Sequence, residues 1–204
     1  MRTNAIKIMV KGWVKVLPFY LFTLLPLLTS CSESDGTEEE FVDWRSKNEA
    51  YFEQQYALHS GSGIVRKWSL DETSSGVQHT DCILVDVLEE GRGETSPLYT
   101  DSVEVHYIGK LLPSTSYAGG YVFDKSYSTY DPEVSVPKTF LVSGLISGFS
   151  TALQHMHRGD HWRVTVPYQL GYGASGSGSI PGYSTLIFEI RLVDFWSKEK
   201  GDRK

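Results

Sequence analysis

A short segment, residues 147–156, is followed by two stretches with the alternating pattern of β-strands. Its apolar residues recur at the spacing i, i+3, i+4 and i+7 of one helix face. They are Phe149, Ala152, Leu153 and Met156. A helix this short is marginally stable alone, so that face must be buried on something larger. The alternating stretches 162–166 and 186–192 predict a sheet as the partner, and hence an α+β fold. Ser147 or Ser150 is expected to cap the first turn.

Residues 1–30 have the character of an export signal rather than of folded protein. Four basic residues and no acidic residue accompany the apolar run 17–28. The run is short for a membrane-spanning helix, and Pro18 and Pro26 interrupt it. It ends in Leu-Thr-Ser-Cys at residues 28–31, which resembles the lipobox of bacterial lipoproteins. We expect a lipoprotein signal peptide and an acylated Cys31; the alternative is a simple secretory signal.

Cleavage before Cys31 leaves an acidic chain. The formal net charge changes from −6, with 19 basic and 25 acidic residues, to −10, with 15 and 25. Such a chain is a poor candidate for binding nucleic acid. The second cysteine, Cys82, lies in an apolar run and has no remaining partner for an internal disulfide. We interpret it as a small core residue without a redox role.

The mature chain divides by composition. Residues 31–40 are acidic and lack apolar side chains apart from Cys31, so they predict a solvated tether; similar runs also resemble surface-export signals of some lipoproteins. Residues 41–58 carry aromatic side chains at helical spacing, and 41–77 are expected to form an N-terminal helix and linker. That aromatic face packs on its own domain or, alternatively, on a partner. Residues 78–197 form the main domain, and 198–204 a polar tail.

Strand patterns also occur at residues 82–87 and 103–107, and residues 111–122 predict a long loop. A series of short motifs runs through these elements. They are Val105-His106-Tyr107-Ile108-Gly109, Val122-Phe123-Asp124-Lys125-Ser126, Thr139-Phe140-Leu141-Val142, Leu145-Ile146-Ser147-Gly148-Phe149, Leu153-Gln154-His155-Met156, Gly171-Tyr172-Gly173, Ile180-Pro181 and Thr185-Leu186-Ile187-Phe188-Glu189-Ile190-Arg191-Leu192.

In this order and spacing, the motifs resemble the FKBP family of peptidyl-prolyl cis-trans isomerases. The resemblance is strongest to the exported bacterial lipoprotein branch that includes the macrophage infectivity potentiator, and it covers about residues 81–196. It implies an FKBP-like curled antiparallel sheet of five or six strands around one short helix. The segment 41–58 would add an extra N-terminal helix.

The resemblance also implies an apolar pocket between helix and sheet. Its catalytic residues would be Tyr107, Phe123, Asp124, Tyr172 and Phe188. Its substrate-binding residues would be Phe140, Leu145, Ile146, Phe149 and Ile180. Tyr172 would donate a hydrogen bond to the substrate carbonyl, and Asp124 would orient Tyr107 and the bound strand rather than act as a base. Three departures from the family pattern are Phe149 in place of a usual Trp, a longer loop at 112–122, and Gly182 in place of a second Pro.

The implied function is isomerisation of X-Pro bonds in exported polypeptides, with no cofactor and with rapamycin and tacrolimus as inhibitors. The lipid on Cys31 would anchor the protein to the bacterial cell envelope, on the periplasmic or surface face of the outer membrane. The alternative is a non-catalytic binding or chaperone module with the same fold. All the aromatic and Asp positions of the implied pocket are filled, which favours the enzyme.

Two other patterns are less informative. His155, His157 and His161 are close in sequence, but residues i and i+2 of a helix point apart, and no carboxylate or Cys completes a ligand set. We therefore expect no metal site. Residues 171–178 are rich in Gly but lack the Gly-Lys-Ser/Thr of a phosphate-binding loop, so they predict a flexible flap over the pocket.

We predict that Cys31 is the acylated N-terminus of the mature protein, because the basic residues, the apolar run and the four-residue motif coincide. Mass spectrometry of the membrane fraction should find a lipid-bearing N-terminal Cys peptide, and Cys31→Ala should release the chain from the membrane. A water-soluble chain with an unmodified N-terminus elsewhere would contradict this.

Overall fold

The computed structural model describes residues 40–71, 73–131 and 134–197. These residues fall in one compact unit, 37–204. The predicted signal peptide, Cys31, most of the predicted tether and the polar tail lie outside the described residues. No helix in the described ranges is both long and apolar enough to span a bilayer.

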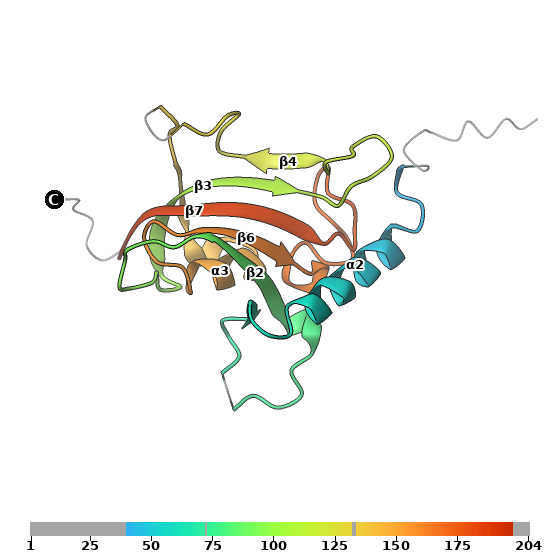
Figure 1. Ribbon diagram of the computed structural model, residues 1–204, viewed down its shortest axis with the longest axis horizontal. Coiled ribbons are helices and arrows are strands. Elements are labelled where there is room, and N and C mark those ends of the chain that lie inside the picture. The colour runs from blue at the N-terminus through green and yellow to red at the C-terminus, as the bar shows by residue number, and fades with distance from the viewer. Residues whose placement is uncertain (1–39, 72, 132–133, 198–204) are drawn as a thin grey trace, which may run out of the picture. The chain divides into compact units, whose positions relative to one another are not determined.

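An antiparallel sheet of seven strands forms the body of this unit (Figure 1). Its strands are β1 (Ile64–Arg66), β2 (Cys82–Glu89), β3 (Asp101–Lys110), β4 (Val122–Lys125), β5 (Lys138–Leu141), β6 (His161–Val166) and β7 (Leu186–Ser197). The order is β1-β2-β6-β7-β3-β4, and β5 also pairs with β3. The predicted α+β fold is confirmed. The seventh strand is the three-residue β1, which extends the sheet beyond β2.

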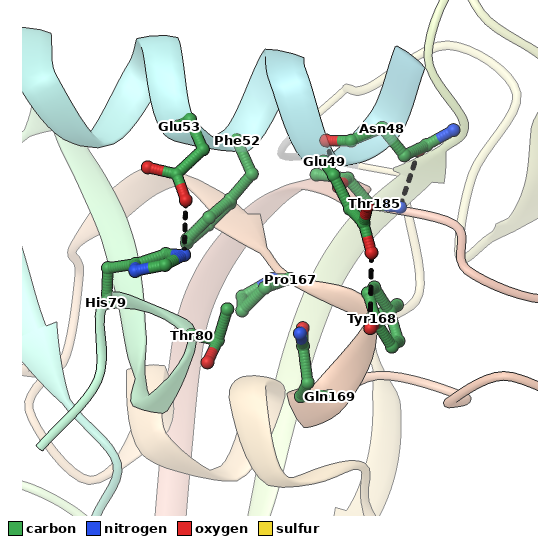
Figure 2. Close-up of a pocket in the computed structure, with 10 residues that line it drawn as sticks. All are labelled: Asn48, Glu49, Phe52, Glu53, His79, Thr80, Pro167, Tyr168, Gln169 and Thr185. Atoms are coloured by element: carbon green, nitrogen blue, oxygen red, sulfur yellow. Dashed lines mark hydrogen bonds and ion pairs between the residues drawn. The ribbon is translucent and has the colours of Figure 1, made fainter. Parts of the chain in front are cut away.

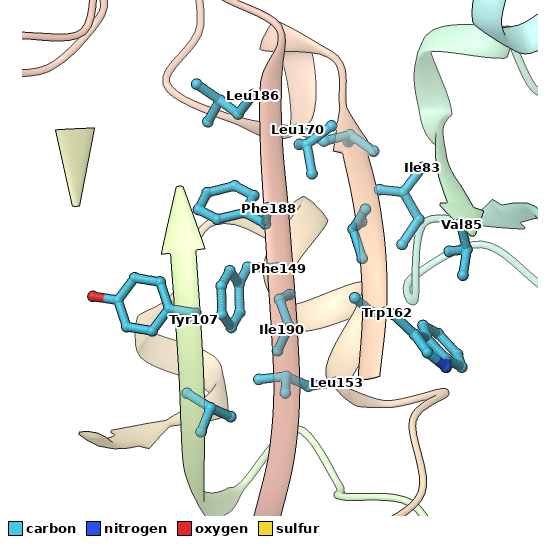
Figure 3. Packing of buried hydrophobic residues seen from close by; sticks show 14 of the residues in the cluster. Ile83, Val85, Tyr107, Phe149, Leu153, Trp162, Leu170, Leu186, Phe188 and Ile190 are labelled. Carbon is cyan, nitrogen blue, oxygen red and sulfur yellow. The ribbon is translucent and has the colours of Figure 1, made fainter. Parts of the chain in front are cut away.

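In the part of the chain that the structure describes, the sheet is accompanied by the α-helices α2 (Trp44–Leu58) and α3 (Ser147–Leu153). Three short 3₁₀ turns are η1 (His79–Asp81), η2 (Val142–Gly144) and η3 (Tyr168–Leu170). The strand residues that alternate in sequence do face one side. The buried members of this set are Val103, Val105, Tyr107, Trp162, Val164, Val166, Leu186, Phe188, Ile190 and Leu192. Figure 3 shows how side chains from α3 and the strands gather into one core.

The expected capping of α3 is wrong. Ile146 occupies the N-cap position, and no side chain caps the helix. Ser147 is already the first helical residue, and its carbonyl accepts a hydrogen bond from Thr151 Oγ1 at 2.8 Å. Ser150 is buried and donates to the carbonyl of Val142 at 2.7 Å. Its hydroxyl therefore ties α3 to η2 instead of satisfying the first turn. The helix ends at Leu153, three residues before the predicted end.

The helix α2 packs on the same unit. Trp44, Asn48 and Phe52 lie on one face at helical spacing and are buried. The helix begins later than residue 41 because Asp43 has a left-handed backbone, with φ of 55°, which is incompatible with a right-handed helix. Cys82 is buried, as its apolar surroundings predict.

The close contact of α3 with β6 gives a stability prediction. A Cβ at Gly148 would lie 2.3 Å from Val166 Cγ1, and Val166 is a stiff, fully buried side chain. Gly148→Ala should therefore lower the free energy of unfolding by about 1–3 kcal/mol, although Ala favours helix. Gly144→Ala is the matched control, because a Cβ there meets nothing within 4 Å. Equal stability of both variants in urea denaturation would contradict the packing described.

Candidate active site

Aromatic side chains from three elements meet beside α3. Tyr107 on β3, Phe149 on α3 and Phe188 on β7 are each only 4% exposed. The Phe149 ring packs edge-to-face on both others, with centroid distances of 5.1 Å to Phe188 and 5.8 Å to Tyr107 (Figure 3). Alternation along β3 and β7 and the apolar face of α3 direct the three rings to one place. Phe149 therefore forms the base of an apolar site.

Two half-buried rings extend this site toward the surface. Phe123 on β4 packs edge-to-face on Phe188 at 5.6 Å, and Phe140 on β5 packs on Tyr107 at 5.8 Å. We call the five rings the aromatic cluster; its members are Tyr107, Phe123, Phe140, Phe149 and Phe188. Leu145 and Ile146, between η2 and α3, are partly buried against the same core, and Ile180 is buried in it.

Tyr172 lies in the segment that joins η3 to β7 and is 38% exposed. The pKa of its hydroxyl is raised, first by burial and second by the negative charge of Asp124. Tyr172 is therefore a protonated hydrogen-bond donor near the cluster. Of the ten predicted pocket residues, eight belong to the core or pack against it, Asp124 is hydrogen-bonded to Tyr107, and Tyr172 interacts with Asp124 through its charge.

A set of hydrogen-bonded polar side chains lies at the edge of the aromatic cluster. The hydroxyl of Tyr107 donates a hydrogen bond to Asp124 Oδ2, and the backbone N–H of Lys125 donates to Asp124 Oδ1 at 2.8 Å. Lys138 Nζ lies 3.3 Å from Asp124 Oδ1 and 3.2 Å from the Tyr107 hydroxyl. The structure thus shows Asp124 holding Tyr107, as expected, but also adds Lys138, which the sequence analysis missed. Its position two residues before Phe140 on β5 puts both side chains on one face, and that spacing was the available signal.

The surroundings set the protonation of this pair. Burial raises the pKa of the Tyr107 hydroxyl, and the hydrogen bond to Asp124 and its negative charge raise it further. Burial also acts to raise the pKa of Asp124, but the hydrogen bonds from Tyr107, Lys125 and Lys138 outweigh it and lower that pKa. Asp124 is therefore a carboxylate that accepts hydrogen bonds at neutral pH, which suits an orienting role and not that of a general base.

Gly109 is a second residue that the sequence analysis did not assign to the site. A Cβ there would lie 2.6 Å from the Phe123 ring and 2.8 Å from the Phe188 ring. Only a residue without a side chain lets both rings meet over β3. A Gly inside a strand pattern is the signal that could have identified it, because it often marks such a close approach.

The histidine stretch has structural contacts. A ring nitrogen of His155 donates to the carbonyl of Thr151 at 2.8 Å, near the end of α3. His161 Nδ1 lies 3.7 Å from Glu89 Oε1. Within the described ranges, no three or more His, Cys, Asp and Glu side chains are grouped to hold a metal ion.

Comparison with known proteins agrees with this geometry. Residues 93–193 match the family model of FKBP-type peptidyl-prolyl cis-trans isomerases. The FKBP-type 22 kDa peptidyl-prolyl cis-trans isomerase of Escherichia coli is 38% identical over 130 residues, which are 63% of this chain and 54% of that protein. The macrophage infectivity potentiator of Trypanosoma cruzi is 39% identical over 115 residues, 56% of this chain and 53% of that protein. The chain thus spans about half the length of these relatives.

Solved structures show the same fold. The crystal structure of FkpA from Escherichia coli superposes with a TM-score of 0.57 and 26% identity, covering 77% of this chain and 63% of that one. A peptidyl-prolyl cis-trans isomerase from Pseudomonas syringae superposes with a TM-score of 0.51 and 28% identity, covering 74% of this chain and 94% of that one.

The Tyr107–Asp124 contact gives a pH prediction. The pKa of Asp124 is lowered in the folded state, so its stabilising contribution is present above the unfolded value of about 4 and is lost as pH falls through the folded value. Tyr107→Phe removes one donor, so Asp124 should titrate at higher pH by ¹³C NMR. The stability difference from wild type should be larger at pH 7 than at pH 2.

Tyr121→Phe removes a hydroxyl from the loop before β4 and serves as the control; it should leave the titration of Asp124 unchanged. An Asp124 titration that is the same in wild type and Tyr107→Phe would show that the hydrogen bond does not set the protonation of the carboxyl.

Proposed function

Because residues 93–193 belong to the FKBP-type peptidyl-prolyl cis-trans isomerase family, we propose that the chain catalyses cis-trans isomerisation of X-Pro peptide bonds. The observation that carries the proposal is the aromatic cluster with Tyr107 and Asp124 joined at its edge, all within the matched segment. The function of the whole protein is proposed on this basis, since the relatives are longer.

The chemistry suits such a site. Rotation about an amide bond has a barrier of about 18–20 kcal/mol, because the planar form is stabilised by resonance. The twisted transition state loses that resonance and much of the amide dipole. An apolar surface that excludes water therefore favours the twisted form over the planar form, and no covalent step is needed.

Each part of the site has a role in this proposal. Phe123, Phe149 and Phe188 hold the prolyl ring by apolar contact. Tyr172, a protonated donor, hydrogen-bonds the substrate carbonyl. Asp124 fixes the Tyr107 ring, which forms one wall, and Lys138 neutralises the carboxylate charge next to the apolar surface. Leu145, Ile146, Ile180 and Phe140 complete the apolar contact with the substrate.

We further propose exported polypeptides as substrates and the bacterial cell envelope as the location, with a lipid on Cys31 as the anchor. The support is the charge and apolar pattern of residues 1–31. Rapamycin and tacrolimus are the proposed inhibitors, because ligands of the FKBP family occupy the same apolar surface.

One observation favours a second function, the binding of unfolded chains. Exposed apolar side chains lie on the segment that leads into and through β5, the strand that carries Phe140. Val134 is 73%, Val136 is 77% and Leu141 is 37% exposed. Scattered surface apolar residues are common, but a group close in sequence to Phe140 suits contact with an extended hydrophobic chain.

The test is an NMR exchange measurement on a short X-Pro peptide, with the chain from Ser32 onward. Wild type should accelerate exchange, and rapamycin should abolish the acceleration. Phe149→Ala should lower kcat/KM by about tenfold or more, because truncation of a buried ring leaves a cavity at the base of the site. Phe149→Trp should retain activity if the family's larger ring fits.

A folded wild-type protein that leaves peptide exchange unchanged would overturn the isomerase function. If that protein still delayed aggregation of an unfolded client, the binding function would be supported instead.

A further inference from the structure

The N-terminal half of α2 contacts both ends of one segment, residues 167–185, which joins β6 to β7. This segment carries Tyr172 and Ile180, two residues of the candidate site. The family model begins at residue 93, so α2 lies outside the matched part of the chain. Its contacts with the 167–185 segment therefore need an explanation of their own.

The end of the segment is held by Asn48. This side chain is fully buried in the middle of α2. Its Oδ1 accepts a hydrogen bond from the backbone N–H of Thr185 at 2.7 Å, and its Nδ2 donates to the carbonyl of Trp44 at 2.7 Å (Figure 2). The Thr185 hydroxyl donates to the Asn48 carbonyl at 3.3 Å. This buried amide fixes the position of the Thr185 backbone, because breaking the bond would leave buried polar groups without a partner.

Trp44 extends this contact toward the site. Its Nε1–H donates to Ser184 Oγ at 2.9 Å, and Ser184 Oγ donates to the carbonyl of Pro181 at 2.7 Å. Trp44 and Ser184 are both buried. The chain of hydrogen bonds thus runs from α2 to the residue that follows Ile180.

The beginning of the segment is held by Glu49. Tyr168 donates from its hydroxyl to Glu49 Oε1 at 3.4 Å (Figure 2). The Tyr168 ring packs edge-to-face on Tyr183 at 5.1 Å, and the Arg45 guanidinium lies over the Tyr183 ring at 4.5 Å. Arg45 also pairs with Glu49 at 2.9 Å. One turn of α2 therefore contacts both ends of the segment at once.

In the middle of the segment, Ile180 is buried in the core and its backbone pairs with that of Ser177. Gly173, Gly176 and Gly178 have positive φ, and Tyr172 is 38% exposed. The backbone of Gly173, the neighbour of Tyr172, is bonded to both ends of the segment. Its N–H donates to the carbonyl of Tyr168 at 2.8 Å, and its carbonyl accepts from the N–H of Tyr183 at 2.9 Å. The place of Tyr172 thus depends on Tyr168 and Tyr183, which contact Glu49 and Arg45 of α2.

We propose that α2 is a positioning element of the active site, in which Trp44, Asn48 and Glu49 hold the 167–185 segment so that Tyr172 and Ile180 face the substrate. This proposal rests on the proposed isomerase function. A cavity of about 230 Å³ lies between α2, η1 and η3 (Figure 2), so α2 reaches this segment largely through polar side chains rather than through continuous apolar packing. Loss of one polar contact between α2 and the 167–185 segment should then displace the segment without unfolding the hydrophobic core.

The C-terminal half of α2 provides matched controls. Glu53 pairs with His79 of η1 at 2.6 Å, and Phe52 is buried beside the same histidine, with ring centroids 6.3 Å apart. His79 lies outside the 167–185 segment. Phe52→Leu therefore lowers stability without releasing the segment, and Glu53→Gln removes a surface contact of the same helix.

The experiment compares Asn48→Ala, Trp44→Phe and Glu49→Gln with these two controls in the chain from Ser32 onward. Peptide exchange gives kcat and KM, and amide hydrogen exchange by mass spectrometry follows residues 171–183. Asn48→Ala and Trp44→Phe should lower kcat/KM by about tenfold, mainly through kcat, because Tyr172 no longer meets the twisted carbonyl. Exchange of residues 171–183 should accelerate at least severalfold, while β2 and β3 stay protected.

When Phe52→Leu and a positioning variant are compared at equal free energy of unfolding, Phe52→Leu should change neither kcat/KM nor the amide exchange of residues 171–183. Glu53→Gln should keep kcat/KM within twofold of wild type. If Asn48→Ala does not fold, Trp44→Phe and the partly exposed Glu49→Gln decide the question. An active wild type whose positioning variants behave like Phe52→Leu would overturn the positioning role alone. A wild type that does not accelerate peptide exchange, although residues 171–183 are protected from amide exchange, would overturn the isomerase function. The contacts of α2 would then have no role in catalysis.

Discussion

The packing of the Phe149 ring against Phe188 and Tyr107 is the contact on which the rest of the structure depends. The helix that carries Phe149 has seven residues and no capping side chain, so it has little stability of its own. Burial of its apolar face stabilises it, and the same burial draws β3 and β7 around it. One contact therefore stabilises the core and forms the base of the candidate site.

The pairing of β3 with β7 places the other rings. Gly109 is in register with Phe188, and Tyr107 is in register with Ile190. A shift of one residue in this register would put Tyr107 and Phe188 on opposite faces of the sheet. The missing side chain at Gly109 then leaves room for the Phe123 ring to reach Phe188. Backbone register and one glycine thus determine the shape of the apolar surface.

Charge is confined to the edge of this surface. Asp124 is paired with the Tyr107 hydroxyl and with Lys138, so the carboxylate has partners and does not face the substrate alone. The 167–185 segment, which carries Tyr172 and Ile180, is hydrogen-bonded at Thr185 to Asn48 of α2, an element that precedes the family-matched residues. The candidate site thus includes residues from a segment that is bonded to a distant part of the chain.

Local patterns were enough to predict the α+β fold, the buried faces of the strands and of α3, and the motifs that carry the family. These features depend on periodicity and on residues close together in sequence, which one sequence displays directly. The caps of α3, the strand β1, and the parts played by Lys138 and Gly109 did not follow from them. The role of Ser150 depends on Val142, whose carbonyl meets the Ser150 hydroxyl only in the folded protein.

The same limit applies to α2. Its aromatic spacing predicted a buried face, but the partners of Trp44 and Asn48 lie 140 and 137 residues away, at Ser184 and Thr185. The sequence around Asn48 does not show whether its side chain is exposed or is buried and bonded to a distant segment. The sequence by itself determined which faces must be buried, because hydrophobic burial follows side-chain type and period. Only the tertiary structure decided which buried polar groups meet, because hydrogen bonds between distant segments require atomic positions that the completed fold alone provides.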